Sequence, residues 1–229
     1  VLYEEFLRKR RLDKEDIIEK PSHVRSLATS LKDKFPEEIY KLLKISGEIA
    51  DRLGFNAYLV GGSVRDLLLG QENFDIDIVV EGDGILFAKT LSENLGARMR
   101  SHQRFGTARI IQNGLRLDIA TARTEYYESP AALPKVETSS IKKDLYRRDF
   151  TINTLAIKLN PKDFGLLIDF FGGQRDIREK TVRVLHNLSY IEDPTRAFRA
   201  IRFSERFGFK LRKHTENLIK SAIKMNLFE

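Results

Sequence analysis

An Asp-x-Asp pair, Asp75 and Asp77, is the feature of this 229-residue sequence best able to do chemistry. It lies in the stretch 74–80, whose alternation predicts a strand with both carboxylates on one face. Like charges on one face repel unless a cation lies between them. Asp118, on a second expected strand, is a candidate third carboxylate. Carboxylate oxygens suit magnesium, and two such ions would activate a hydroxyl and stabilise a leaving pyrophosphate. The plainer interpretation is an exposed strand face.

A glycine turn comes shortly before this strand, in the run Gly61-Gly62-Ser63-Val64-Arg65-Asp66. Glycines allow backbone N–H groups to approach a phosphate, and the N-terminus of the following helix adds positive potential. Arg65 can reach the same anion. No Gly-Lys-Ser/Thr follows, so this is not a Walker loop. An ordinary strand-to-helix turn would have the same sequence.

A third group of polar residues opens an expected helix near the C-terminus. Asp193 is a natural N-cap with Pro194 at the first helical position, which by itself only predicts a good helix start. Arginines then recur every three or four residues and predict one cationic stripe, opposite an apolar side formed by residues such as Phe198 and Ile201. The stripe comprises Arg196, Arg199, Arg202 and Arg206. A solvated charged face would explain it equally well.

The elements that must position these residues predict an α+β fold. Helices are expected from Pro36 to Gly54, from Ser63 to Leu69 and from Phe87 to Leu95, with strands at 57–60, 74–80, 108–111 and 115–120. Asn113-Gly114 predicts a hairpin between the last two. The polar stretch 124–140 is expected to be a long loop, and the chain from Ile191 onward to be helical.

Composition and charge limit the classes of protein to which this sequence can belong. Without cysteine, disulfides and thiolate metal sites are excluded, and a reducing cytoplasm is the expected location. The apolar runs are much shorter than the roughly 20 residues needed to cross a bilayer, so no membrane partner is expected. Residues 1–140 carry a net charge of −1 and residues 141–229 carry +8. This asymmetry favours a polyanionic partner for the C-terminal part.

Together, these motifs resemble a known family. Residues 58–82, which read YLVGGSVRDLLLGQENFDIDIVVEG, are similar to the nucleotidyltransferase motif of the class II tRNA nucleotidyltransferase and bacterial poly(A) polymerase family. Residues 117–126 (LDIATARTEY) resemble its third head strand, and 144–156 (DLYRRDFTINTLA) its ribose- and triphosphate-contacting motif. Residues 191–209 (IEDPTRAFRAIRFSERFGF) resemble the neck helix that reads the incoming base. The likeness covers about residues 37–225, in the family's order.

The resemblance implies a polymerase-beta-like head with a small mixed sheet and flanking helices, followed by an all-α neck. Residues 1–35 would be an extension or linker, 36–187 the head and 188–229 a truncated neck. It implies two Mg²⁺ ions held by Asp75 and Asp77, with Asp118 as a further catalytic carboxylate. The nucleotide-binding residues would be Gly61, Gly62, Arg65, Asp66, Arg148, Asp149, Asp193, Arg196, Arg199 and Arg202. For Arg148 and Asp149, a surface ion pair is the plainer interpretation.

The implied activity is template-independent addition of AMP, and in some members CMP, from ATP or CTP to the 3′ end of tRNA. Members that add A, CC, CCA or poly(A) share these motifs. The long 124–140 stretch argues against CC-only enzymes, and the lead-in PSHVRSLAT favours A addition. Two rivals remain: a non-catalytic nucleotide- or RNA-binding module, and a transferase acting on a small molecule. Only an RNA acceptor would bind with a steep dependence on salt.

Overall fold

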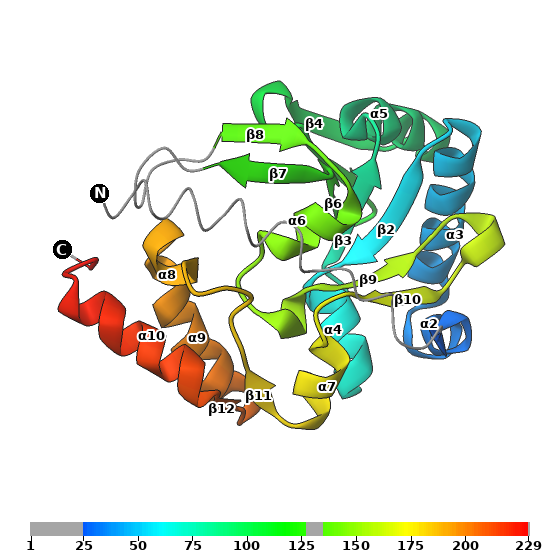
Figure 1. The fold of residues 1–229 in the computed structure, drawn as a ribbon. Helices are drawn as coiled ribbons and strands as arrows, with labels where there is room; N and C mark the ends of the chain where they lie inside the picture. Colours follow the sequence, from blue (N-terminus) through cyan, green and yellow to red (C-terminus); the bar gives the residue numbers. More distant parts are fainter. Residues whose placement is uncertain (1–24, 127–134, 229) are drawn as a thin grey trace.

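The computed structural model describes residues 25–126 and 135–228, and its centre is a mixed eight-stranded sheet in the order β1-β10-β9-β2-β3-β6-β5-β4 (Figure 1). All neighbouring strands are antiparallel except β3 and β6, which run parallel. The strands are β1 (Arg25–Ser26), β2 (Asn56–Val60), β3 (Ile76–Glu81), β4 (Arg98–His102), β5 (Thr107–Gln112), β6 (Leu115–Thr121), β9 (Leu155–Lys158) and β10 (Leu166–Asp169). The predicted α+β class is confirmed, with a larger sheet than the sequence suggested.

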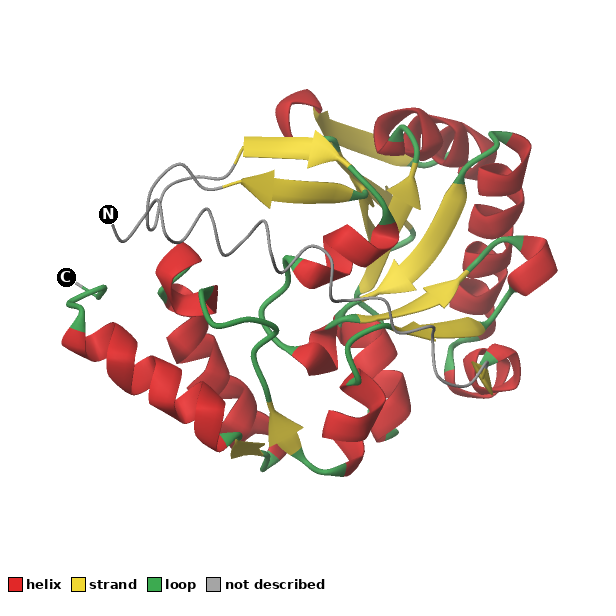
Figure 2. Cartoon of the chain, viewed as in Figure 1, coloured by secondary structure: helices red, strands yellow, loops and turns green. Residues whose placement is uncertain are grey.

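Two helices cover one face of the sheet, α3 (Glu37–Arg52) and α5 (Gly84–Leu95) (Figures 1 and 2). Their apolar residues recur at helical spacing, and Leu43, Phe87 and Leu91 are fully buried against the strands. The side chain of Asp83 accepts hydrogen bonds from two backbone N–H groups and so caps α5. These helices lie behind the sheet and leave its other face to the functional residues.

Shorter elements connect the strands and complete the fold. The remaining α-helices are α2 (Ala28–Lys34), α4 (Gly62–Leu69), α6 (Ile141–Tyr146), α7 (Gly173–Arg178), α8 (Ser189–Glu192), α9 (Thr195–Phe207) and α10 (Lys213–Lys224). Single 3₁₀ turns occur at η1 (Gln103–Phe105), η2 (Thr151–Asn153) and η3 (Pro161–Asp163). The hairpin between β5 and β6 turns at Asn113 and Gly114, which both have positive φ, as the sequence predicts.

The end of the predicted N-terminal extension packs on the head. Strand β1 pairs with β10, and Leu27, Leu31 and Phe35 are buried in the main core. Residues 1–24, the rest of that segment, lie outside the described residues.

The stretch 124–140 is not a continuous loop, so this prediction was wrong in part. Strands β7 (Arg123–Tyr126) and β8 (Lys135–Thr138) form an antiparallel pair in the register Arg123↔Thr138. Backbone pairing between two short polar segments leaves no hydrophobic alternation, which explains why the sequence pattern gave no strand signal. Residues 127–134, between the strands, lie outside the described residues.

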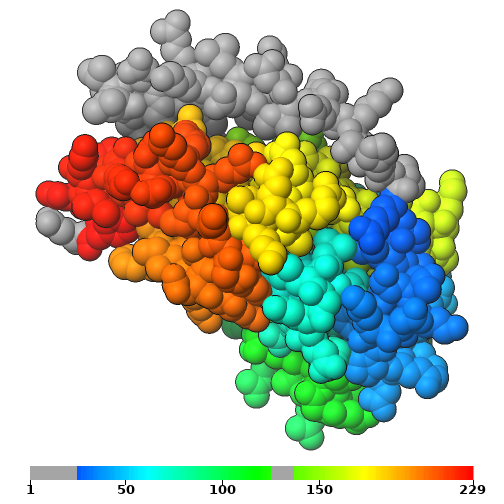
Figure 3. All heavy atoms as spheres, turned by 90° about the horizontal axis from the view of Figure 1, so that it is seen from below, coloured from blue at the N-terminus to red at the C-terminus, as the bar shows by residue number. Residues whose placement is uncertain are grey.

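The predicted neck, 188–229, contains α8, α9 and α10 but also a two-residue strand, β12 (Lys210–Leu211). This strand runs parallel to β11 (Thr181–Val182) of the head, which corrects the expectation of an all-α neck. The rings of Phe150 and Phe203 meet edge to face at 5.7 Å, and Figure 3 shows the orange and red C-terminal segments packed against the yellow one. Head and neck therefore share a core.

None of the helices in the described residues is both long and apolar enough to span a membrane.

Gly47 of α3 packs directly against the backbone that follows β9. A Cβ added there would lie 1.8 Å from the backbone oxygen of Leu159, just after β9. We therefore expect Gly47→Ala to lower the free energy of unfolding by about 3 kcal/mol, since overpacking of a rigid core forces backbone shifts. Chemical denaturation measures this. The control is Glu48→Ala at the adjacent exposed position, and equal stability of the two variants would contradict the packing described.

Candidate active site

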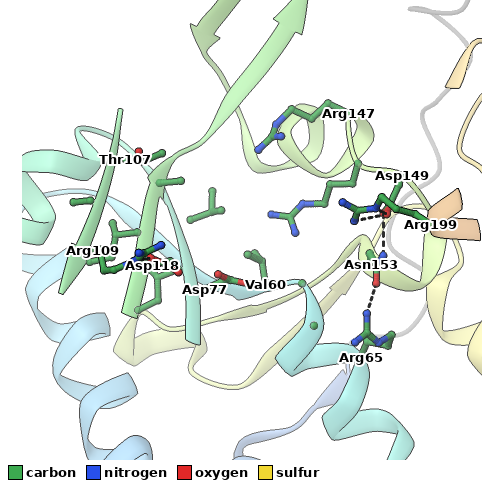
Figure 4. A pocket seen from close by; sticks show the side chains of 18 of the residues that line it. Val60, Arg65, Asp77, Thr107, Arg109, Asp118, Arg147, Asp149, Asn153 and Arg199 are labelled. Carbon is green, nitrogen blue, oxygen red and sulfur yellow. Dashed lines mark hydrogen bonds and ion pairs between the residues drawn. The ribbon is translucent and has the colours of Figure 1, made fainter. Parts of the chain in front are cut away.

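Two carboxylates form the base of the site, Asp77 on β3 and Asp118 on β6. The parallel register places them directly opposite each other on neighbouring strands (Figure 4). Burial raises the pKa of Asp77, and the nearby charges of Asp118 and Asp75 raise it further, whereas Arg148 lowers it. Burial also acts on Asp118, but hydrogen bonds from Arg109 and Arg116 hold its pKa below the ordinary value. Asp77 and Asp118, here called the acidic pair, therefore have pKa values shifted in opposite directions.

Asp75 is close enough to Asp77 for its charge to raise the pKa of that carboxyl, but it does not line the pocket that Asp77 and Asp118 face. Strand β3 begins at Ile76, so Asp75 precedes the strand instead of sharing its regular face, and its side chain is exposed. The Asn73 side chain accepts a hydrogen bond from the Asp75 N–H at 3.0 Å, a local turn that competes with strand pairing. The described residues contain no group of three His, Cys, Asp or Glu side chains close enough to hold one metal.

The donor set nevertheless fits magnesium. Only carboxylate oxygens are offered, and Mg²⁺ is bound in proteins by one or two carboxylates that are completed by substrate phosphates and water. Asp77 and Asp118 face a pocket of about 770 Å³, large enough for a nucleotide. Asp77 and Asp118 carry like charges that repel each other, and a bound cation would relieve this repulsion.

The glycine turn lies at the edge of this pocket. Gly61 has φ +76° and ψ −134°, and Gly62 begins α4. A Cβ on Gly61 would lie 3.2 Å from Arg148 Nη1 and 3.4 Å from Asp77 Oδ2. The positive φ therefore favours glycine here, and any larger residue would also crowd the ends of these two side chains. The turn therefore places backbone without a side chain between the Arg148 guanidinium and Asp77.

Arg65 and Asp66 form a buried ion pair behind that turn. Asp66 is fully buried and accepts from Arg65 Nε at 2.7 Å and from Nη2 at 2.9 Å. Arg65 also donates from Nη1 to Asn153 Oδ1 at 2.6 Å, and its guanidinium lies over the rings of Phe203 and Phe207. Arg65 lines the pocket whereas Asp66 does not. Asp66 is therefore placed to hold Arg65, away from the space open to a nucleotide.

The segment 144–149 supplies two further arginines. Asp144 is fully buried and accepts from Arg147 Nη2 at 2.8 Å and Arg148 Nη2 at 3.2 Å, and these arginines hold its pKa below the ordinary value in spite of burial. The Arg148 Nε is buried and has no hydrogen-bond partner in the described residues. Arg147 and Arg148 both line the pocket.

Asp149 joins head and neck. Its Oδ1 accepts from Asn153 Nδ2 at 2.9 Å, and its Oδ2 accepts from Arg199 Nε at 2.8 Å (Figure 4). Through Asn153 the same network reaches Arg65. Asp149 is nearly completely buried, whereas the Arg199 side chain is 54% exposed, so the pair joins a buried carboxylate to a guanidinium at the surface of the pocket.

The neck contributes Asp193, Arg196 and Arg199 to the pocket. Asp193 Oδ1 accepts from the backbone N–H of Thr195 at 3.0 Å, which is the predicted capping contact. Arg196 is buried and donates to Ser189 Oγ and to the backbone oxygen of Arg147. Arg196 therefore secures α9 to the head.

The stripe predicted for α9 is not continuous. Arg202 is exposed and lies outside the pocket, and Arg206 approaches Asp66 at 3.9 Å. Phe198 and Ile201, expected on the apolar side, are 64% and 50% exposed, whereas Arg196, expected on the cationic stripe, is 5% exposed. Helical periodicity gave the two faces but could not tell which one meets the head.

Several pocket residues were not predicted. Arg100, His102, Thr107 and Arg109 come from β4 and β5, and Asn153 and Phe203 from the head–neck contact. The sequence does carry a signal for the first set, because cationic residues alternate with others over 98–102. Their place beside Asp118 depends on strand order, which the local sequence does not encode.

Comparisons with known proteins show which sequences and folds this chain is similar to. A family profile described as the poly(A) polymerase head domain matches residues 57–183. An A-adding tRNA nucleotidyltransferase of Geobacter sulfurreducens is 60% identical over 195 residues, which are 85% of this chain and 22% of that protein. The chain thus spans about a fifth of that relative's length.

Solved structures are similar over most of the chain. A Thermotoga maritima CCA-adding enzyme complexed with tRNA has a TM-score of 0.81 at 48% identity, covering 90% of this chain and 47% of that one. A CCA-adding enzyme in complex with ATP has a TM-score of 0.80 at 49% identity, covering 89% and 46%. Both the fold and the order of its motifs are therefore shared with these structures.

Because the pKa values of Asp77 and Asp118 shift in opposite directions, we expect the two Asp→Asn variants to change the stability of the fold in opposite directions. The raised pKa of Asp77 stabilises the fold only at low pH, and this stability is lost as pH rises through the raised pKa. Asp77→Asn should therefore raise the melting temperature at pH 7, and its advantage should shrink as pH falls toward the ordinary Asp value of about 3.9. Thermal denaturation over a pH series measures this.

Asp118→Asn is the matched variant. The lowered pKa of Asp118 contributes stability above the ordinary value, and this contribution is lost as pH falls. This variant should melt lower than the parent at pH 7 and approach it in acid. If both variants changed the melting temperature at pH 7 in the same direction, the opposite pKa shifts of Asp77 and Asp118 would be refuted.

Proposed function

The chain belongs to the poly(A) polymerase head-domain family, and on this premise we propose that it is the catalytic part of a template-independent RNA nucleotidyltransferase. It transfers AMP from ATP to the 3′ end of tRNA and releases pyrophosphate. The observation that carries the proposal is a single pocket lined by the acidic pair, the glycine turn and cations from both head and neck. A purely structural role would not require these groups to converge.

The two substrates would meet at the acidic pair. The RNA 3′ hydroxyl oxygen attacks the α-phosphorus and forms the new O–P bond, while the bond from that phosphorus to the bridging oxygen breaks. Pyrophosphate leaves with the electron pair, and the hydroxyl proton is released to solvent. Asp75 and Asp77, with Asp118 beside them, are the residues to hold Mg²⁺, which when bound supplies charge stabilisation and activates the hydroxyl.

The triphosphate would lie along the glycine turn. Gly61 and Gly62 bring backbone N–H groups to its edge, and Arg148 lies within contact of the turn. The negative charge that develops on the leaving pyrophosphate is matched by fixed cations already in place, which avoids reorganisation during the reaction. The charge of Arg65 is largely balanced by its ion pair with Asp66. Asp149 acts indirectly, through its ion pair with Arg199.

Base selection is assigned to the start of α9. Asp193 offers an acceptor, and the Arg196 Nε lies 3.7 Å from Asp193 Oδ2. To donate to a base, Arg196 would exchange one of its contacts with Ser189 and Arg147. Such a pair can match the edges of adenine and cytosine and reject those of guanine and uracil without a template. Arg199 lines the same pocket, whereas Arg202 would need to move to take part.

Addition of a single A is favoured by the relative of highest identity reported above, which is an A-adding enzyme. CCA addition is the second candidate, because the structures similar to this chain are CCA-adding enzymes. A poly(A)-adding or non-catalytic role has no specific observation in its favour. A cytoplasmic location stays a prediction from the absence of cysteine.

Three RNA substrates test the proposal: tRNA transcripts ending just before the two terminal cytidines, after the second cytidine, and after the final adenosine. With Mg²⁺ and labelled ATP or CTP supplied separately, we expect one A to be added only to the second transcript. Chelation of the metal with EDTA should stop incorporation, and Asp77→Asn should abolish it. Added C would indicate a CCA enzyme, and an inert parent protein would overturn the proposal.

Asp193→Asn tests base selection. Asparagine keeps a capping oxygen for Thr195, so α9 stays intact, but replaces one carboxylate oxygen by a donor. We expect the ratio of kcat/KM for ATP to that for UTP and GTP to fall by about tenfold or more, because an acceptor that distinguishes the bases is replaced by a donor. Thr195→Ala keeps the capping backbone N–H but removes the hydroxyl that also donates to Asp193 Oδ1, and it serves as control. Unchanged discrimination in Asp193→Asn would remove Asp193 from this role.

A further inference from the structure

One face of the strands β4, β5 and β6 is cationic and exposed. Its arginines, here called the cationic strand face, are Arg98, Arg100, Arg109 and Arg116, and all four side chains are exposed. The opposite face of the same strands is buried under α5, with Ile110 and Leu117 fully covered. No helix in the part of the chain that the structure describes covers this face, so packing against a helix does not account for its four arginines.

This face leads directly to the acidic pair. The strand registers place Arg100 opposite Arg109, Arg109 opposite Asp118, and Asp118 opposite Asp77. The four residues thus form one row across four strands, with neighbours about 4.8 Å apart in the pairing direction. Arg100 and Arg109 line the pocket from this side, and Figure 4 shows Arg109 on the far side of Asp118 from Arg147 and Arg199.

The outer and inner arginines of the face differ in their partners. Arg109 Nε and Arg116 Nη2 each lie 2.6 Å from an oxygen of Asp118. No ion pair joins Arg98 or Arg100 to a carboxylate within residues 25–126 and 135–228. The inner arginines are therefore held by the site, and the charge of the outer two is available to an anion.

An exposed aromatic ring lies at the end of the β4–β5 connection. Phe105, in η1, is 45% exposed, and the Arg104 guanidinium lies 5.6 Å from the centre of its ring. The Arg123 side chain donates to the backbone oxygen of Phe105 at 3.1 Å and so fixes this turn. Cations along a strand face with an aromatic ring at one end are typical of surfaces that bind single-stranded nucleic acid.

We propose that the cationic strand face binds the single-stranded 3′ end of the RNA acceptor, with phosphates on Arg98 and Arg100 and a base stacked on Phe105. This rests on the proposed function and assigns its two substrates to opposite sides of the acidic pair. The nucleoside triphosphate takes the side of the glycine turn, Arg148 and α9. The RNA strand enters from β4 and β5, and its terminal hydroxyl reaches Asp77 from there.

The test is a double variant, Arg98→Ala with Arg100→Ala, in the whole protein. Binding of a fluorescent single-stranded RNA ending in two cytidines is followed by anisotropy over a salt series. We expect affinity to fall about tenfold and the slope of log affinity against log salt to become shallower by about 1 to 1.5, since each phosphate contact on a single strand contributes about 0.7. The KM for ATP should change less than twofold.

The matched control removes the same charge from the opposite side of the sheet. Arg52→Ala with Lys89→Ala alters exposed positions on α3 and α5. It should leave the RNA affinity and the salt slope at the parent values. An RNA affinity equal in the two double variants would overturn the proposal and show the face to be merely solvated.

Phe105→Ala separates stacking from charge. It should weaken RNA binding about fivefold or more without changing the salt slope. A shallower slope, or unchanged affinity, would contradict the assignment of the ring to a base. Because the parent's nucleotide incorporation is measured in parallel, an inactive parent would refute the proposed function, whereas an active parent with unaffected variants would refute the RNA-binding face alone.

Discussion

The like-charge pair of Asp77 and Asp118 is the constraint on which the rest of the site depends. Parallel pairing of β3 and β6 fixes the two carboxylates side by side, and burial makes the charge of Asp77 unfavourable. The surrounding cations follow from this: Arg109 and Arg116 bind Asp118 on one side, and Arg148 lies near Asp77 on the other. The protein keeps a destabilising arrangement that a divalent cation and an anionic substrate would together neutralise.

The second side of the pocket is completed by residues of the neck, which packs on the head. Asp149 accepts from Arg199, Arg196 donates to the backbone of Arg147, and Asn153 links Asp149 to Arg65. The contacts of Asn153 with Asp149 and Arg65 are buried, and Asp149 itself is nearly completely buried, so loss of a donor here would leave an unpaired polar group in the core, which is more costly than the loss of an exposed ion pair. The nucleotide side of the pocket is therefore held by a partly buried polar network, whereas the outer arginines of the cationic strand face, Arg98 and Arg100, are exposed.

Much of this arrangement was predictable from local sequence. The helix and strand around Gly61 and Gly62, and the hairpin at Asn113-Gly114, follow from periodicity and turn chemistry, and the structure agrees with them. The pairing of β7 with β8 was missed because it rests on backbone hydrogen bonds without apolar alternation. Arg100 and Arg109 were missed since only the strand order brings them to Asp118. For α9, amphipathicity could not reveal that Arg196 would be buried and Phe198 exposed.

The most direct test of this account is a crystal structure of the chain with Mn²⁺ and a non-hydrolysable ATP analogue, using anomalous scattering to locate the metal. The account predicts metal at Asp77, the triphosphate along Gly61, Gly62 and Arg148, and the adenine near Asp193 at the start of α9. A triphosphate lying instead on Arg100 and Arg109, with the neck side of the pocket empty, would contradict it.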